Sequence, residues 1–278
     1  MDYIEVEIKI EPRQPGSDLL VSQLADVGFE SFQETHDGFF AWIPMKDFKE
    51  SELVQTISLG DSLGKISWTK RIIPAQNWNE AWEKNFEPVC IGDELIIRAP
   101  FHAKQKGFKR ELVIQPQQSF GTGHHQTTRL MVRKLLTMPL GGRYILDMGC
   151  GTGILGILSS QLGAENVLGI DIDEGAVENA KENAALNQVK NMKMLVGDEQ
   201  LMLSEKFDVV IANINRNILL NAMKKYSEVM KDDASLLLSG FFRQDVKELT
   251  SRAAQFGLKE KSTHEEDEWS LIHLVKNQ

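Results

Sequence analysis

The chain has 278 residues, 42% of them hydrophobic and 26% charged, which is ordinary for a soluble globular protein that can hold two domains. Its formal net charge of −9 argues against direct nucleic-acid recognition, because contacts with phosphates require clustered Lys and Arg. We expect no membrane span and no secretory signal, and two cysteines in separate segments fit the reducing cytoplasm.

Residues 1–74 predict a small α+β domain. Its expected elements are, in chain order, a strand at 3–10, a helix at 17–27, a hairpin at 32–43, a helix at 50–59 and a strand at 65–73. Ser17 and Gly28 are the expected cap and terminator of the first helix, and the hairpin turns at Asp37-Gly38. This β-α-β-β-α-β order predicts a ferredoxin-like sandwich.

The same segment, 1–74, is strongly acidic, with 7 Lys and Arg against 13 Asp and Glu. The domain has no cofactor motif, so we predict that 1–74 is a substrate-recognition domain for a basic protein. The alternative is that the acidity only aids solubility.

Residues 75–90 predict a linker helix, because Trp78, Trp82 and Phe86 are spaced to lie on one helical face. Residues 90–98 and 111–114 then look like a hairpin at the start of a larger domain, 91–278.

From Tyr144 onward, strands and helices alternate, which predicts an α/β fold with a mostly parallel, Rossmann-like sheet. The expected strands are at 144–148, 166–171, 192–196, 207–212, 234–239, 258–263 and 269–276. The expected helices are at 128–136, 154–162, 174–187, 216–230 and 243–255. A short turn joins the last two strands, so they must be antiparallel. A seven-stranded sheet with one antiparallel strand is the arrangement of class I methyltransferases.

The most informative segment is Ile145–Gly153, an apolar strand ending in Asp147 and followed by glycines at alternate positions. Glycines such as Gly149 and Gly151 let the backbone approach a ligand closely, and the N-terminus of the next helix faces the same place. Asp171 ends the following strand, where a carboxylate can accept both hydroxyls of a ribose. These features predict a nucleoside site.

Two kinds of nucleoside fit this site. Gly151–Gly156 matches the dinucleotide fingerprint, with Asp171 at the expected distance beyond Gly151, so a nicotinamide dehydrogenase is the rival interpretation. Asp147 argues against it, because a carboxylate repels phosphates but suits a cationic sulfonium. The unit also begins only at Tyr144, whereas dinucleotide domains usually begin with it. The segment instead resembles the class I S-adenosylmethionine (AdoMet) methyltransferases.

Three further segments are expected beside the cofactor. Residues 120–128, rich in Gly and Thr, precede a helix and could hold the methionine carboxylate. Their two histidines lack an acid or Cys at ligand spacing, so we expect no metal. Asp198 is placed to meet the adenine amino group. Asn213 ends the fourth strand, and its side-chain carbonyl can orient an amine. The Pro-Pro edge and stacking aromatic of base and amide methylases are missing after Asn213, which disfavours those substrates.

Several of these motifs together resemble one family, the ribosomal protein L-eleven (L11) methyltransferases (PrmA). They are Asn77-Trp78-x-x-Ala-Trp82, Phe120–Thr128 as Phe-Gly-Thr-Gly-His-His-Gln-Thr-Thr, Leu146–Leu155, Gly169–Asp173, Ala212-Asn213-Ile and Leu238-Ser-Gly240. The resemblance implies AdoMet-dependent methylation of the α-amine and lysine ε-amines of that large-subunit ribosomal protein in the cytoplasm. The alternatives are an AdoMet enzyme acting on another protein or a small amine, and a ribosome-binding protein without activity.

Carried over position by position, the resemblance implies that Thr128, Gly149, Asp171 and Asn213 contact AdoMet. Gly151 belongs to the same cofactor loop, and Asn213 is also the expected catalytic residue, since it would position the amine. One departure is Asn215, where we expect a small or apolar residue.

Overall fold

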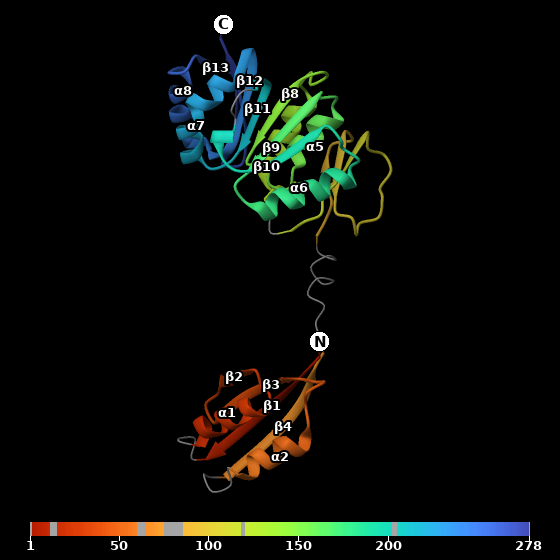
Figure 1. Cartoon of the computed structure of the whole chain (residues 1–278), viewed down its shortest axis with the longest axis vertical. Helices are drawn as coiled ribbons and strands as arrows, with labels where there is room; N and C mark the ends of the chain where they lie inside the picture. The colour runs from red at the N-terminus through yellow and green to blue at the C-terminus, as the bar shows by residue number, and fades with distance from the viewer. Residues whose placement is uncertain are drawn as a thin grey trace. The chain divides into compact units, whose positions relative to one another are not determined.

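The chain forms two compact units, residues 1–85 and 86–278 (Figure 1). The computed structural model describes residues 2–11, 16–59, 65–74, 86–117, 120–201 and 205–277, and each unit is considered by itself. Most of the predicted linker helix, including Trp78 and Trp82, lies outside the described residues. Phe86 to Cys90 belong to the second unit and are not helical, since residues 86–88 have no regular secondary structure and a strand begins at Val89. The predicted helix is therefore wrong for these residues.

The first unit is a four-stranded antiparallel sheet with two helices, as predicted. Its elements are β1 (Tyr3–Glu11), α1 (Gly16–Asp26), β2 (Ser31–Glu34), β3 (Gly38–Pro44), α2 (Glu50–Leu59) and β4 (Lys65–Ile73). The strand order β2-β3-β1-β4 is that of a ferredoxin-like sandwich. Alternate β1 side chains, such as Val6 and Ile8, are fully buried against Leu20 and Leu24 of α1. Ser17 is not the cap expected before α1, since it lies within the helix and is buried.

The second unit contains the predicted seven-stranded sheet. Its strands are β8 (Tyr144–Met148), β9 (Asn166–Asp171), β10 (Met192–Val196), β11 (Phe207–Asn213), β12 (Met230–Phe242), β13 (Leu258–Glu266) and β14 (Trp269–Lys276). They lie in the order β10-β9-β8-β11-β12-β14-β13. Only β14 among them runs antiparallel to both of its neighbours, which confirms the class I methyltransferase arrangement.

Helices cover both faces of this sheet. They are α4 (Gln126–Leu136), α5 (Ile154–Gln161), α6 (Glu174–Leu186), α7 (Arg216–Val229) and α8 (Val246–Ala254). One core joins α4, α5 and α6 to one face, and a separate core joins α7 and α8 to the other (Figure 1). Neither core includes a residue of the first unit. Among the described residues, no helix combines the length and hydrophobicity that crossing a membrane requires.

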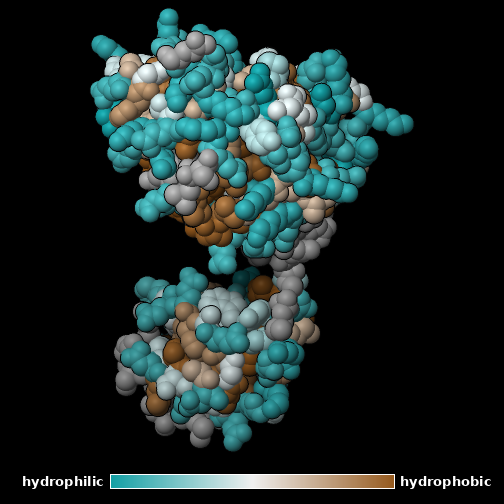
Figure 2. Space-filling view, turned by 45° about the horizontal axis from the view of Figure 1, so that its top comes forward, coloured by the Kyte–Doolittle hydropathy of each residue, from teal (hydrophilic) through white to brown (hydrophobic). Residues whose placement is uncertain are grey.

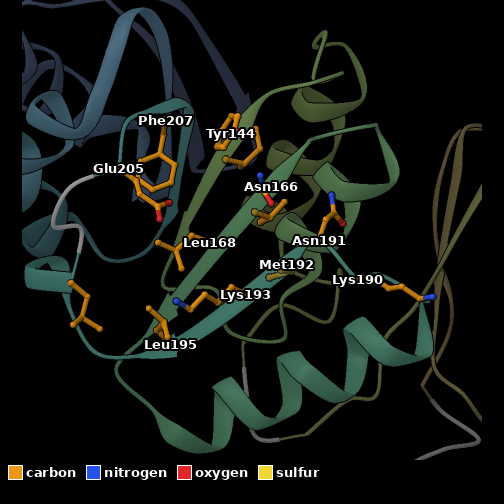
Figure 3. A pocket seen from close by; sticks show the side chains of 13 residues that line it. Tyr144, Asn166, Leu168, Lys190, Asn191, Met192, Lys193, Leu195, Glu205 and Phe207 are labelled. Atoms are coloured by element: carbon orange, nitrogen blue, oxygen red, sulfur yellow. The ribbon is translucent and has the colours of Figure 1, made fainter.

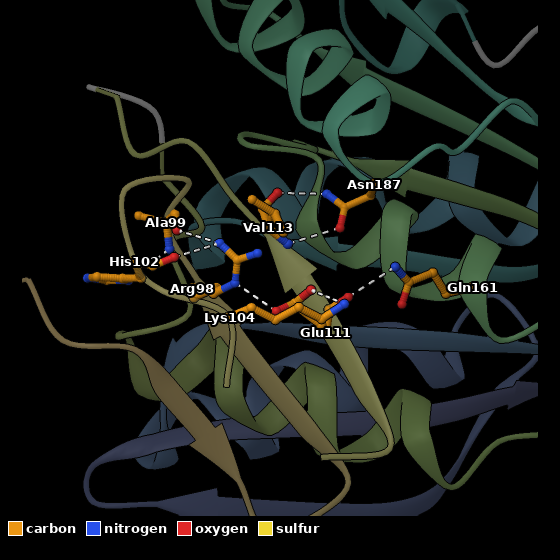
Figure 4. Close-up of polar contacts among 8 residues, drawn as sticks. All are labelled: Arg98, Ala99, His102, Lys104, Glu111, Val113, Gln161 and Asn187. Carbon is orange, nitrogen blue, oxygen red and sulfur yellow. Dashed lines mark hydrogen bonds and ion pairs between the residues drawn. The ribbon is translucent and has the colours of Figure 1, made fainter. Parts of the chain in front are cut away.

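A three-stranded sheet precedes the larger one. Strands β5 (Val89–Ile91) and β6 (Leu95–Arg98) form a hairpin, but β7 (Arg110–Val113) pairs with β6 in parallel. The prediction that 111–114 completes a hairpin is therefore wrong. The chain between β6 and β7 is long enough to return to the same edge before pairing. Arg98 fastens the two parallel strands, since its Nε donates to Glu111 at 2.7 Å (Figure 4).

A cavity of about 360 Å³ lies at the amino ends of β8, β9 and β10. Tyr144, Leu168, Leu195 and Phe207 supply its apolar wall, and Lys190 and Lys193 lie at its rim (Figure 3). Ligands of open α/β sheets bind beyond the carboxyl ends of the strands, so this cavity is not the expected cofactor site.

Candidate functional site

The glycine loop after β8 adopts a backbone that other residues rarely take. Gly149 has φ +71° and Gly151 has φ +53°, in the left-handed region that favours glycine. A Cβ at Gly149 would lie 2.2 Å from a methyl group of Ile214, and one at Gly151 would lie 2.2 Å from the carbonyl oxygen of Phe120. Both positions therefore need glycine for shape as well as for conformation.

Asp171 is held against this loop. One carboxylate oxygen accepts a hydrogen bond from the Gly151 N–H at 2.8 Å, and the other accepts from the Asp173 N–H at 3.1 Å. Asp171 ends β9 beside the end of β8. The acid and the glycine loop come from different strands, and these bonds fix them relative to each other.

A cavity of about 500 Å³ opens at this edge of the sheet. It is lined by Phe120, Met148, Gly149, Gly151, Asp171, Ile172, Asp173, Ala176, Asp198, Asn213, Ile214, Asn215, Ile218 and Asn221. The surface of the larger unit shows exposed hydrophobic side chains among polar ones (Figure 2), and at the cavity these include Phe120, Ile172 and Ile218. The carboxyl ends of β8, β9, β10 and β11 all contribute to it, as the sequence predicts.

Four of the five predicted site residues, Gly149, Gly151, Asp171 and Asn213, line this cavity. The fifth, Thr128, is fully buried in the first turn of α4 and does not line it. Thr128 Oγ1 and Asn213 Oδ1 are both buried with no hydrogen-bond partner among the described residues. Buried polar atoms normally have a partner, so a polar ligand that supplies one fits here.

The donor and acceptor set suits a nucleoside that carries an amino acid. Asp171 offers carboxylate oxygens of the kind that accept from ribose hydroxyls, and the glycine loop lets a ligand approach the backbone. Asn213 also lines the cavity, and its buried amide oxygen has no hydrogen-bond partner among the described residues. The residues present therefore fit AdoMet.

Asp147 has a different place from the one expected. Its carboxyl is only 1% exposed, does not line the cavity, and accepts a hydrogen bond from the Gly156 N–H at 2.9 Å. Burial raises its pKa to about 7, and the nearby Asp171 charge adds to the increase. The expectation that this carboxyl faces the ligand is therefore wrong, and Asp147 instead braces the first turn of α5.

The two histidines of the 120–128 loop form structural hydrogen bonds. His125 is the N-cap of α4, and its ring accepts from the Thr127 N–H. Burial, together with the charge of Arg129, lowers the pKa of His125, which favours this neutral, accepting ring. His124 Nε2 lies 2.9 Å from the carbonyl oxygen of Glu87. The described residues contain no group of three His, Cys, Asp or Glu that could hold a metal ion.

A row of aromatic rings near the cavity includes two residues, Phe242 and Trp269, that belong to no predicted motif. Phe120 contacts His125 with ring centroids 5.2 Å apart, His125 contacts Trp269 at 4.7 Å, and Trp269 contacts Phe242 at 4.4 Å. Trp269 and Phe242 also line a hollow of about 580 Å³ that shares Asn215 with the main cavity. The segment directly after Asn213 lacks an aromatic residue, but Phe120, which comes from a distant segment, lines the same cavity.

Asn215, the departure from the expected motif, has a clear local role. It is the N-cap of α7, and its Oδ1 accepts from the Ile218 N–H at 3.2 Å. A short polar residue is favoured at this position because it satisfies an otherwise unpaired helix N–H.

Comparisons with known proteins agree on one family. A family model described as "Ribosomal protein L11 methyltransferase (PrmA)" matches residues 30–277. The "Ribosomal protein L11 methyltransferase" of Porphyromonas gingivalis is 43% identical over 261 residues, which cover 93% of this chain and 90% of that protein. The one from Phocaeicola vulgatus is 40% identical over 281 residues and covers 99% of each chain.

A solved structure gives the same result. The crystal structure of a ribosomal protein L11 methylase from Lactobacillus delbrueckii subsp. bulgaricus aligns with a TM-score of 0.65 and 25% identity, covering 69% of this chain and 100% of that one. The family model spans most of the chain, and full-length relatives are well over 30% identical to it. The chain therefore belongs to the PrmA family of AdoMet-dependent protein methyltransferases.

Proposed function

We propose that this protein transfers methyl groups from AdoMet to amino groups of ribosomal protein L11, at its α-amine, its lysine ε-amines or both. The observation that carries the chemistry is that Asn213, whose buried amide oxygen has no hydrogen-bond partner among the described residues, lines the same cavity as the glycine loop and Asp171. The full-length relatives that are named for this substrate support the choice of protein. With a ribosomal substrate, the reaction would take place in the cytoplasm.

Gly149, Gly151 and Asp171 would hold the cofactor. The glycine loop would lie against its amino-acid part and Asp171 against the ribose, with Asp198 at the adenine end of the cavity. Bound AdoMet supplies a methyl group on a positively charged sulfur. Thr128 does not line the cavity, and its buried hydroxyl, which has no partner among the described residues, would contact the cofactor only after a shift of the 120–128 loop.

Asn213 would orient the incoming amine. Its amide oxygen can accept an N–H of the amine, which directs the nitrogen lone pair toward the methyl group. A neutral amide does not hold the amine as an ammonium ion, as a carboxylate would. A lysine amine has a pKa of about 10.4, so the enzyme must bind the neutral form or let water remove the proton.

The aromatic row would form the wall along which a lysine side chain reaches Asn213. Phe120 lines the cavity and is 52% exposed, so part of this residue is available to a ligand. Aromatic faces attract ammonium groups and pack well against methylene chains. Both properties suit an aliphatic amine.

The first unit would recruit the substrate. Residues 1–74 carry 7 basic and 13 acidic residues, a balance that attracts a basic protein. The net charge of the whole chain, −9, gives no basis for direct binding to RNA.

The decisive test is incubation of the protein with radiolabelled AdoMet and separated ribosomal proteins. We expect label in L11 alone, at amines located by mass spectrometry, and much less label with the Asp171→Ala variant when AdoMet is limiting. Label in another protein or only in small amines would replace the proposed substrate, and label in no fraction despite AdoMet binding would contradict an amine methyltransferase.

A further inference from the structure

Thr152 joins the glycine loop to the 120–128 loop. It is fully buried, and its N–H donates to the carbonyl oxygen of Phe120 at 3.0 Å. Its hydroxyl donates to the carbonyl oxygen of Gly121 at 2.6 Å. Thr152 is not among the residues that line the cavity, so these bonds act on the site through its neighbours.

Asn183 of α6 holds the other side of Thr152. The Asn183 side chain is fully buried, and its Nδ2 donates to the carbonyl oxygen of Thr152 at 2.9 Å. Its Oδ1 accepts from the Gln115 N–H at 2.7 Å. One amide thus binds both the glycine loop and the strand end that leads toward Phe120.

The two loops also interlock sterically. Gly151 leaves no room for a Cβ beside the carbonyl oxygen of Phe120, and a Cβ at Gly121 would lie 2.7 Å from Thr152 Oγ1. A shift of the glycine loop must therefore move Phe120 and Gly121 as well. Phe120 is the end of the aromatic row that lines the cavity.

We propose that Thr152 and Asn183 are positioning residues that couple cofactor binding on the glycine loop to the placement of Phe120. Bound AdoMet would restrict the motion of the glycine loop. The hydrogen bonds of Thr152 would then restrict residues 120–121 as well, so that Phe120 is held in the position in which it contacts the amine. Cofactor binding consequently precedes productive amine binding. This inference rests on the proposed function, because it assigns Phe120 to the amine side of the site.

Asn187 provides a matched control for Asn183. It lies one helical turn further along, at the end of α6, and exchanges two hydrogen bonds with the backbone of Val113 (Figure 4). Like the Asn183–Gln115 hydrogen bond, these bonds join α6 to residues 113–115, but neither of them reaches the glycine loop. Asn187→Ala should therefore lower the melting temperature much as Asn183→Ala does, without uncoupling the loops.

Hydrogen–deuterium exchange tests the coupling without any amine substrate. In the natural protein, AdoMet should slow exchange in both 149–153 and 120–128. In Thr152→Val and Asn183→Ala it should slow exchange in 149–153 only, whereas Thr152→Ser and Asn187→Ala should keep the full response. Protection of 120–128 by AdoMet in Thr152→Val, or its loss in Asn187→Ala, would overturn the proposal.

Steady-state kinetics provide a second readout. Loss of the donor to a buried carbonyl should raise KM for the amine substrate about tenfold in Thr152→Val, with a much smaller change in AdoMet affinity, and Thr152→Ser should restore the KM. An unchanged KM would also overturn the coupling. Failure of the natural protein to methylate L11 would instead refute only the proposed substrate, because the exchange experiment needs AdoMet alone.

Discussion

Gly151→Ala separates the two reasons for glycine in the loop after β8. Gly151 has φ +53°, and an added Cβ would lie 2.2 Å from the backbone oxygen of Phe120. Gly142 has φ +70° but no atom within 4 Å of an added Cβ. Gly142→Ala therefore imposes only the strain of the left-handed backbone, whereas Gly151→Ala imposes that strain and a steric clash.

The expected costs differ accordingly. A left-handed backbone costs a residue with a side chain about 1–2 kcal/mol, and this should be the whole effect of Gly142→Ala on stability. In Gly151→Ala the contact must also widen from 2.2 Å to the ordinary 3.4 Å. That movement breaks the Thr152–Phe120 hydrogen bond, which adds about 0.5–1.5 kcal/mol to the loss of stability. It also shifts the Gly151 N–H, which donates a hydrogen bond to Asp171.

Calorimetric titration with AdoMet and urea unfolding should be measured on both variants. We expect Gly151→Ala to raise the Kd for AdoMet by about 10- to 100-fold, at about 1.4 kcal/mol for each factor of ten. Gly142→Ala should bind AdoMet as the natural protein does. A Gly151→Ala variant with a Kd within twofold of the natural value, or equal loss of affinity in Gly142→Ala, would refute the reasoning.

Four further predictions concern charge, mechanism and domain roles. Asp171→Ala should weaken AdoMet binding by about 1.5–3 kcal/mol, the value of a charge-assisted contact; unchanged affinity by calorimetry, or tighter binding of NADH than of AdoMet, would contradict the cofactor assignment. Burial raises the pKa of Asp147 from 3.8 to about 7, so folding favours its protonated form, and the free energy of unfolding should fall as the pH rises from about 4 to about 7. Urea unfolding of Asp147→Asn should lack this component, and parallel pH profiles for the two proteins would exclude it. Asn213→Ala should reduce turnover more than AdoMet affinity, and single-turnover rates of the natural enzyme should rise from neutral to alkaline pH as the amine loses its proton; a flat profile or an active variant would remove Asn213 from the mechanism. A chain that starts at Phe86 retains both cores of the larger unit and should bind AdoMet but lose L11 methylation; a full rate would show that the first unit does not recruit the substrate.

The sequence alone determined most of the helices and strands and the mostly parallel character of the larger sheet. Alternating strands and helices specify a parallel sheet, and the short turn before Trp269 makes the last strand antiparallel. Glycines at 149 and 151 and an acid at 171 predict the edge of the sheet at which the cavity lies, because they stand at or just beyond the ends of two strands. These signals are local, since backbone conformation and hydrophobic period depend on neighbours within a few residues.

Local signals also misled in specific places. Asp147 looked like a ligand-facing charge, because a sequence shows that an acid ends a strand but not which way its side chain turns. The direction of β7 could not be read either, since pairing with β6 depends on the path between them. Ser17 had the right residue type for a cap, but α1 begins one residue earlier.

Only the tertiary structure brought together the parts of the site that lie far apart in the chain. Phe120, His125 and Trp269 form one row of rings although its two ends come from distant segments, and Asn183 reaches both Thr152 and Gln115. Such contacts depend on the packing of α6 and β14 against segments that come much earlier in the chain. No periodicity or motif records that packing, because it is the balance of many weak contacts across the core that fixes it.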